Sequence, residues 1–465
     1  MQKKNDVPKI LIPMFIILDI ILLAYALILN TGAFGVVVEK LLGNPSYNII
    51  VIVFTIVLIL LLILLIFVSI FMKNVKRKKI VVIKTEKSPI KEQSKQNAKK
   101  EEDVGKIERF CMLGEIDKKK AEIERVKYES NLSLKGLCED FRNYASSELK
   151  LYYSIDDIRR FIAGMSVSHI LILQGMSGTG KTSLAYAFGS FLDNPTTVIP
   201  VQPMWKERTD LIGYYNEFTK RFNETQLLQK MYEANYSKGI YVTVLDELNI
   251  ARVEYYFAEF LSLLELPNPN DRYLDVVSDK WSTDPKQLKN GRIKLPENMW
   301  FIGTANNDDS TFAISDKVYD RAMIMNLDVK SERFIGANVG KKKVSFEKFT
   351  SLVKEALSEY DISQRNLKRL EELDKYLTNN FHVTFGNRIM KQIKSYIPVY
   401  IACGGNELDA LDDILAKKVM RKLETQNPIY LRNSITGLMD CLDNLFGKDG
   451  MPLCKEFIRR LERSS

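Results

Sequence analysis

Residues 169–185 read HILILQGMSGTGKTSLA, and this stretch decides the fold. The apolar run 170–173 predicts a short buried strand, and residues 183–191 predict a helix. The loop between them is rich in glycine, at Gly175, Gly178 and Gly180. Glycines allow backbone N–H groups to close around phosphates, and the N-terminus of the following helix adds positive potential. We therefore predict an α/β fold built around a phosphate-binding loop.

The loop satisfies the pattern GxxxxGK[ST]. In this pattern Lys181 is expected to reach the β- and γ-phosphates of a nucleotide, and Thr182 to bind Mg²⁺. A chance match is the alternative, but the strand before the loop and the helix after it supply the context that the pattern requires. The predicted nucleotide-binding residues are Gly175, Met176, Ser177, Gly178, Thr179, Gly180, Lys181, Thr182 and Ser183.

Two further apolar runs end in polar side chains. Residues 240–249, IYVTVLDELN, predict a strand ending at Asp246 and Glu247. Asp246 suits the Mg²⁺ shell, and Glu247 suits polarisation of the attacking water. Residues 299–310, MWFIGTANNDDS, predict a third strand, after which Asn306 can orient that water beside the γ-phosphate. A solvated turn is the alternative at both strand ends, since acids and amides are common in turns.

The order of these motifs resembles that of AAA+ ATPases. The stretches VQPMWKERTDLIGYYNEFTKRF (201–222) and LDELNIARVEYYFAEFLSLLE (245–265) are similar to the McrB-like and MoxR-like branch, the AAA_5 group. The resemblance covers about residues 130–460. It implies an ATPase that works with Mg²⁺, a C-terminal helical lid, and a homo-oligomeric ring that we expect to be hexameric.

The resemblance also assigns roles to single residues. It makes Asn306 the sensor-1 residue, Arg321 the arginine finger that reaches the nucleotide of the neighbouring subunit, and Arg388 the sensor-2 residue. With Glu247, these are the predicted catalytic residues. A surface salt bridge is the alternative for each arginine, because exposed arginines are common. The motif that marks the GTP-using member is replaced here by ANNDD (305–309), so we expect ATP.

Two inserted segments flank the acidic strand. Residues 210–222 resemble the hairpin that this branch inserts, and Tyr214, Tyr215 and Phe222 are candidates to grip a polymer in the pore of a ring. The equal alternative is that these rings pack the hairpin itself. Residues 266–295 form a polar insertion to which the sequence assigns no role.

The N-terminal region predicts a membrane anchor. Residues 10–29 are apolar except for Pro13 and Asp19, and residues 49–72 carry no charge. Each run is long enough to cross a hydrocarbon core of about 30 Å. A buried core helix is the alternative for both runs, although soluble helices rarely stay apolar on every face for as long as the second run does. A cleaved signal peptide is a further alternative for the first run. Asp19 is a functional candidate in lipid, or else a neutral or paired group at a helix contact.

Most of the net charge of +9 lies in one linker. Residues 73–100 contain eleven Lys or Arg and two acids, so the remaining residues are close to neutral. This distribution gives no indication of a nucleic-acid-binding face. Lysines before the first span and a basic cluster after the second predict a hairpin in the cell membrane, with both termini and the ATPase domain in the cytoplasm. The five scattered cysteines are typical of a reducing compartment.

The domain plan that follows has five parts: a transmembrane hairpin (1–72), a basic flexible linker (73–105), a helical segment (106–150), the nucleotide-binding domain (151–330) and the helical lid (331–465). Three functions fit it. The first is a membrane-anchored ATPase ring that remodels an unknown protein partner. The second is the motor of a McrBC-type restriction system, with a McrC-like or nuclease subunit encoded separately. The third, a nucleotide-gated scaffold with little turnover, is disfavoured by Lys181, Glu247 and Asn306.

Overall fold

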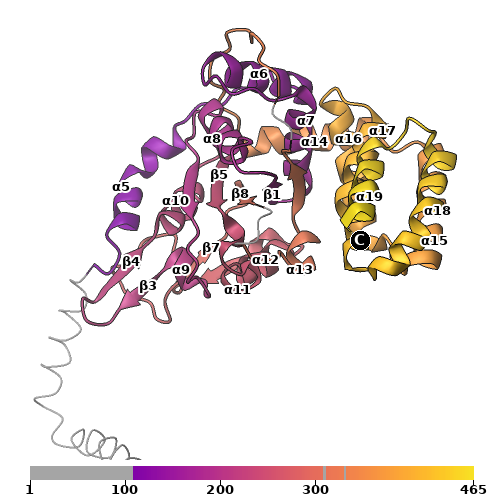
Figure 1. The fold of residues 1–465 in the computed structure, drawn as a ribbon. Helices are drawn as coiled ribbons and strands as arrows, with labels where there is room; N and C mark the ends of the chain where they lie inside the picture. Colours follow the sequence, from indigo (N-terminus) through magenta and orange to yellow (C-terminus); the bar gives the residue numbers. More distant parts are fainter. Residues whose placement is uncertain (1–107, 307–310, 329–330, 465) are drawn as a thin grey trace, which may run out of the picture. The chain divides into compact units, whose positions relative to one another are not determined.

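A five-stranded sheet lies at the centre of the α/β unit (Figure 1). The strand order is β2-β5-β8-β1-β9, and every neighbouring pair is parallel. All of the polar ends predicted from sequence therefore meet at the carboxyl edge of one sheet, where ligands bind in open α/β folds. The strands are β1 (Ile170–Gln174), β2 (Thr197–Pro200), β5 (Tyr241–Asp246), β8 (Met299–Ala305) and β9 (Met323–Asn326).

Alternating side chains of the sheet enter two separate hydrophobic cores. In β8, Trp300 and Ile302 belong to one core, and Met299 and Phe301 belong to the other. Because helices cover both faces, the strands are apolar throughout rather than alternating with polar residues. The first core includes α6 (Leu134–Ser147), α7 (Ile155–Val167) and α8 (Lys181–Phe191); the second includes α5 (Met112–Glu124), α10 (Gln226–Ala234), α11 (Val253–Tyr256), α12 (Ala258–Leu264) and α13 (Asp316–Tyr319).

Two antiparallel hairpins are added to this unit. The first follows α9 (Thr209–Ile212) and pairs β3 (Gly213–Asn216) with β4 (Arg221–Glu224), within the segment predicted as an inserted hairpin. Gly213 opens it at a φ of +96°, and a Cβ there would lie 1.8 Å from the carbonyl oxygen of Asn223. The second hairpin, β6 (Tyr273–Asp275) with β7 (Arg292–Lys294), lies in the insertion 266–295.

The C-terminal part is helical, as predicted for a lid, and Figure 1 shows its helices beside the α/β unit. Ser345, Ser363 and Asn406 precede three of the helices, and each side chain accepts a backbone N–H of the first turn. The elements are α14 (Phe346–Glu359), α15 (Gln364–Phe381), α16 (Gly386–Ala402), α17 (Glu407–Lys418), the 3₁₀ helix η3 (Met420–Thr425), α18 (Pro428–Phe446) and α19 (Pro452–Ser464).

This computed structural model describes residues 108–464, apart from 307–310 and 329–330. The predicted membrane spans and the basic linker therefore lie outside the described residues. Among the helices that are described, none has the length and apolarity needed to cross a bilayer. The α/β arrangement with its parallel sheet and C-terminal helices is confirmed.

Candidate functional site

The glycine-rich loop has a backbone that other residues could not follow. Gly175 leaves β1 at a φ of +142°, and a Cβ there would lie 2.5 Å from the carbonyl oxygen of Leu327. Gly180, at a φ of +92°, is the residue before the first turn of α8, and its carbonyl accepts a hydrogen bond from Tyr153 Oη at 3.1 Å. The loop from 175 to 183 therefore brings backbone N–H groups and a helix N-terminus to one place, as an anion site requires.

Lys181 is folded back on its own loop. Its side chain is buried, and Nζ donates to the carbonyl oxygens of Gly175 at 3.0 Å and Met176 at 2.7 Å. The pKa of Lys181 is lowered, because the effect of burial outweighs the opposing effect of the carboxylates of Asp246 and Asp328. An incoming phosphate would offer this ammonium a charged acceptor in place of two neutral carbonyls, which makes a stronger hydrogen bond.

Asp246 gathers two hydroxyl groups at the end of β5. Its Oδ1 accepts from Thr182 Oγ1 at 2.7 Å and from Thr304 Oγ1 at 2.8 Å. The predicted Mg²⁺ ligands Thr182 and Asp246 are thus brought together, and their donors are the hard oxygens that Mg²⁺ prefers. Within the described residues no group of three His, Cys, Asp or Glu side chains could hold a metal. Mg²⁺ here would take its remaining ligands from phosphates and water.

Glu247 occupies a strained position directly after that strand. It has left-handed backbone angles, φ 53° and ψ 49°, and its side chain is exposed. Its backbone N–H donates to Thr304 Oγ1 at 2.9 Å, so one hydroxyl of β8 fixes both Asp246 and the turn at Glu247. Non-glycine residues in this conformation cluster at functional sites, where the surrounding structure must hold them. No sequence pattern singles out Thr304.

Asn306 follows β8 and lines a cleft of about 1350 Å³. Its carbonyl oxygen accepts a hydrogen bond from Asn249 Nδ2 at 3.1 Å. Asn249 Oδ1, also at the cleft, is buried without a hydrogen-bond partner among the described residues. The predicted sensor residue Asn306 therefore lies at an open cleft, and the side-chain amide of Asn249 holds its backbone in place.

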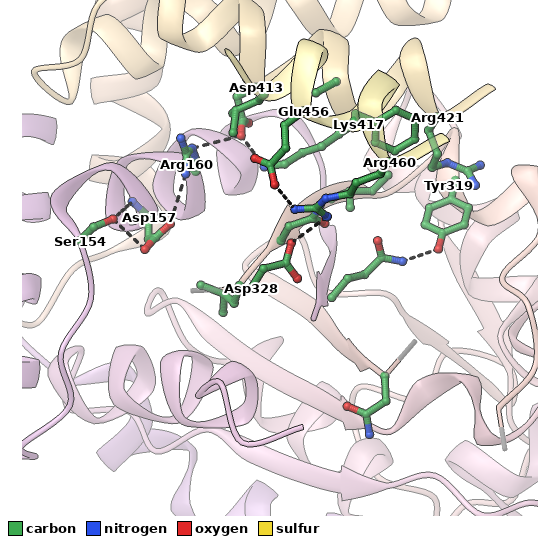
Figure 2. A pocket seen from close by; sticks show the side chains of 18 of the residues that line it. Ser154, Asp157, Arg160, Tyr319, Asp328, Asp413, Lys417, Arg421, Glu456 and Arg460 are labelled. Carbon is green, nitrogen blue, oxygen red and sulfur yellow. Dashed lines mark hydrogen bonds and ion pairs between the residues drawn. The ribbon is translucent and has the colours of Figure 1, made fainter. Parts of the chain in front are cut away.

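The cleft separates the carboxyl edge of the sheet from the C-terminal helices, and Figure 2 shows charged side chains on both sides of it. Two ion pairs connect the sides: Arg160 Nε with Asp413 Oδ1 at 3.1 Å, and Arg460 NH1 with Asp328 Oδ2 at 3.5 Å. The labelled lining residues are Ser154, Asp157, Arg160, Tyr319, Asp328, Asp413, Lys417, Arg421, Glu456 and Arg460.

Tyr319 connects the start of the glycine-rich loop with the helical part. Its hydroxyl accepts a hydrogen bond from Gln174, the last residue of β1, and the guanidinium of Arg421 lies 3.5 Å from its ring centroid. Lys418 Nζ donates to the carbonyl oxygens of Tyr319, at 2.5 Å, and of Ala322. The carbonyls bound by Lys418 flank Arg321, so the C-terminal helices help to place that residue.

Arg321 and Arg388 are brought together, away from the cleft. Neither lines it, and both contact the carboxylate of Glu265, at the end of α12. Arg321 Nε lies 2.7 Å from Oε2, and Arg388 NH2 lies 2.6 Å from Oε1. The salt bridges considered from sequence are thus present, with one shared partner.

Some aromatic side chains of the inserted hairpin are packed and others are exposed to solvent. Phe222 is buried and stacks on Phe110, with ring centroids 4.9 Å apart, and Tyr215 packs against Trp281. Tyr214 is 53% exposed and Phe218, at the turn, is 98% exposed. Of the residues considered for a polymer grip, only Tyr214 is available, and Phe218 was missed because a single aromatic in a polar turn gives no pattern.

The insertion 266–295 binds the start of the described chain. Arg109 is almost fully buried and forms ion pairs with Asp279 at 2.8 Å and Asp284 at 2.7 Å. Its guanidinium also lies 4.4 Å from the ring centroid of Trp281. The insertion therefore packs residues 108–110 against the hairpin, a structural role that the sequence did not indicate.

Comparison with known proteins identifies two regions. Residues 170–322 match the model of an AAA domain (dynein-related subfamily), and residues 338–465 match that of a domain of unknown function (DUF8727). Among solved structures, an ATPase candidate from Cytophaga hutchinsonii ATCC 33406 is similar over 70% of this chain and 97% of its own, at 13% identity and a TM-score of 0.44. No curated protein matches the chain.

Proposed function

We propose that the AAA+ ATPase domain of this chain binds ATP and hydrolyses it with Mg²⁺. The observation that carries the proposal is the cluster at the sheet edge, where Asp246 Oδ1 joins Thr182 and Thr304 beside the loop of Lys181. When bound, Mg²⁺ would offset the negative charge that develops on the phosphates during hydrolysis. Thr182 and Asp246 are the residues that would hold it.

Three other side chains at this edge bind the triphosphate and activate and orient the attacking water. Lys181 exchanges its loop carbonyls for phosphate oxygens and so binds the triphosphate. Glu247 accepts a proton from the attacking water, or polarises it, from the exposed position that its left-handed backbone provides. Asn306, at the cleft, orients the same water by a hydrogen bond from its amide.

We propose further that the active species is a ring, with a hexamer as the expected form. The resemblance assigns Arg321 to the nucleotide of the neighbouring subunit, and Arg321 and Arg388 are held side by side by the carboxylate of Glu265. A guanidinium supplied in trans stabilises the transferring phosphoryl group. Each site would then be complete only between two subunits.

The proposed setting is the cytoplasmic face of a membrane. The apolar runs 10–29 and 49–72 would anchor the chain, and residues 73–105 would tether the ring to them. Such a ring would use hydrolysis to remodel a protein partner near the membrane. The exposed rings of Tyr214 and Phe218 on the β3–β4 hairpin would contact this protein partner.

The direct test is phosphate release by the purified full-length chain with ATP and Mg²⁺. We expect turnover that stops when EDTA removes the metal and that is higher with ATP than with GTP. An assembled, folded protein that binds ATP but releases no phosphate with Mg²⁺ would instead support a nucleotide-gated scaffold.

A further inference from the structure

Glu265 holds two arginines that come from separate parts of the fold. It follows α12, whereas Arg321 lies between α13 and β9, and Arg388 lies in the first turn of α16. Each carboxylate oxygen contacts one guanidinium, Oε2 with Arg321 at 2.7 Å and Oε1 with Arg388 at 2.6 Å. The carboxylate therefore bridges two cations that would otherwise repel each other.

The contact with Glu265 uses one nitrogen of each guanidinium group. An arginine has five N–H donors. Both contacts are close in distance, but no hydrogen bond from either guanidinium to another described residue accompanies them, and Arg321 Nε is buried without one. Glu265 thus restrains Arg321 through Nε and Arg388 through NH2, and the other nitrogens of each guanidinium remain to bind another anion.

The neighbourhood of this cluster is fixed rather than loose. Gln392, about one turn beyond Arg388 in α16, donates through Nε2 to the carbonyl oxygen of Asp320 at 3.0 Å. Ser168 Oγ donates to the carbonyl oxygen of Arg321 itself at 2.8 Å. The backbones that carry the two arginines are therefore held, and the remaining freedom is that of the side chains, which Glu265 limits.

We infer that Glu265 is a positioning residue for hydrolysis, whose carboxylate keeps Arg321 and Arg388 paired to receive the triphosphate of the neighbouring subunit. The inference rests on the proposed role of Arg321 in trans. A triphosphate carries several negative charges, so it competes successfully with one carboxylate for two guanidinium groups. Loss of Glu265 would let the arginines separate, which lowers the rate of hydrolysis without touching the loop that binds ATP.

A matched control lies in α12, the helix that Glu265 follows. Glu259 of α12 accepts from Arg208 NH1 at 2.8 Å through both oxygens, and its side chain is 36% exposed, against 32% for Glu265. Glu259→Gln therefore removes an ion pair of similar exposure that has no part in the proposed site. It separates loss of a helix ion pair from loss of the arginine pair.

The test compares full-length Glu265→Gln, Glu265→Asp and Glu259→Gln with the parent. ATP affinity, phosphate release at saturating ATP, and assembly by sedimentation are measured for each. For Glu265→Gln we expect kcat to fall about tenfold or more, as a fraction of the effect of an arginine finger, with ATP affinity within about twofold of the parent. Glu265→Asp keeps the charge and should recover part of the rate, and Glu259→Gln should hydrolyse at the parental rate.

Mixing distinguishes positioning from a structural role. Subunits with Lys181→Ala carry an intact Glu265, so adding them to Glu265→Gln should restore part of the activity. An assembled Glu265→Gln with the parental kcat overturns the inference, and so does a loss that Glu259→Gln shares equally. If Glu265→Gln does not assemble, an assembled Glu265→Asp decides: a several-fold lower kcat supports the inference and the parental kcat rejects it.

Arg321→Ala, measured in parallel, separates this inference from the proposed function. If Arg321→Ala hydrolyses ATP normally, the trans finger itself is wrong. If Arg321→Ala is inactive while Glu265→Gln is fully active, the finger stands and only the role of Glu265 is rejected.

Discussion

Lys181 and Glu247 at the sheet edge have different proposed roles, so their substitution should affect nucleotide binding and turnover differently. Lys181→Ala removes the ammonium that would hold the phosphates, so we expect nucleotide binding to be lost. Glu247→Gln keeps the loop intact and removes the base, so we expect binding without turnover. Nucleotide affinity and phosphate release, measured on both variants, check this. Normal turnover by Glu247→Gln would reject its assignment as the base, and Lys230→Ala, at a surface ion pair, is the control.

Thr304 allows a sharper test, because one hydroxyl donates to Asp246 and accepts from the backbone of Glu247. Thr304→Val keeps the shape and removes both hydrogen bonds. Leaving two such partners unpaired costs on the order of 1–3 kcal/mol, so we expect kcat to fall roughly tenfold or more while ATP still binds. Thr243→Val is the matched control, since the hydroxyl of Thr243 in β5 is buried and without a partner among the described residues. Equal loss in both variants would contradict the role of Thr304.

Secondary-structure elements, unlike these contacts, were largely predictable from the sequence. The strand of 170–173 and its loop follow from local pattern alone, because an apolar run and glycines leave few alternatives. Thr304 and Glu265 could not be found in this way. Their roles depend on which strands are neighbours in the sheet and on where α16 packs, and neither is encoded in local spacing. For Phe222 the sequence left packing and grip equally open, because it does not tell the packed face of a hairpin from its exposed one, and the structure shows the ring packed.

The link between α17 and the turn at Arg321 predicts a dependence on pH. Lys418 is buried against two backbone carbonyls, and desolvation lowers its pKa to about 7 from an ordinary 10.5. Asp320 opposes this shift, while Arg421, Arg388 and Lys422 add to it. The unfolded chain keeps the proton to a higher pH than the folded chain does. The cost of the buried charge is therefore full below about pH 7, and stability contributed by this group rises from there to about pH 10.

Lys418→Met removes that contribution. We expect the parent to gain stability relative to Lys418→Met as the pH rises from 7 to 9, measured by unfolding midpoints at each pH. Lys422→Met, in the adjacent 3₁₀ helix, should follow the parent. A difference between parent and Lys418→Met that is constant over this range would show that the buried lysine does not titrate there.

At the scale of the whole molecule, the proposed membrane anchor and the ATPase domain are separable. Every predicted nucleotide-binding and catalytic residue lies beyond residue 170, and within the described residues the two hydrophobic cores begin at Phe110. Deleting residues 1–72 should therefore leave the ATPase activity intact and release the protein from the membrane fraction. Fractionation at high salt and a phosphate-release assay measure both. Truncated protein that stays in the membrane pellet would show that this segment is not the sole anchor.

The central claim is that two subunits complete each ATP site, and mixing two inactive variants tests it most directly. Arg321→Ala should bind ATP but lose about 10³-fold or more in turnover, because it lacks the group that stabilises the neighbour's transition state. Lys181→Ala lacks the phosphate-binding ammonium. In a mixed ring, some interfaces pair an intact loop with an intact Arg321, so we expect partial recovery of phosphate release, with assembly verified by sedimentation. A stable Arg321→Ala ring that hydrolyses ATP at the parental rate would contradict the claim.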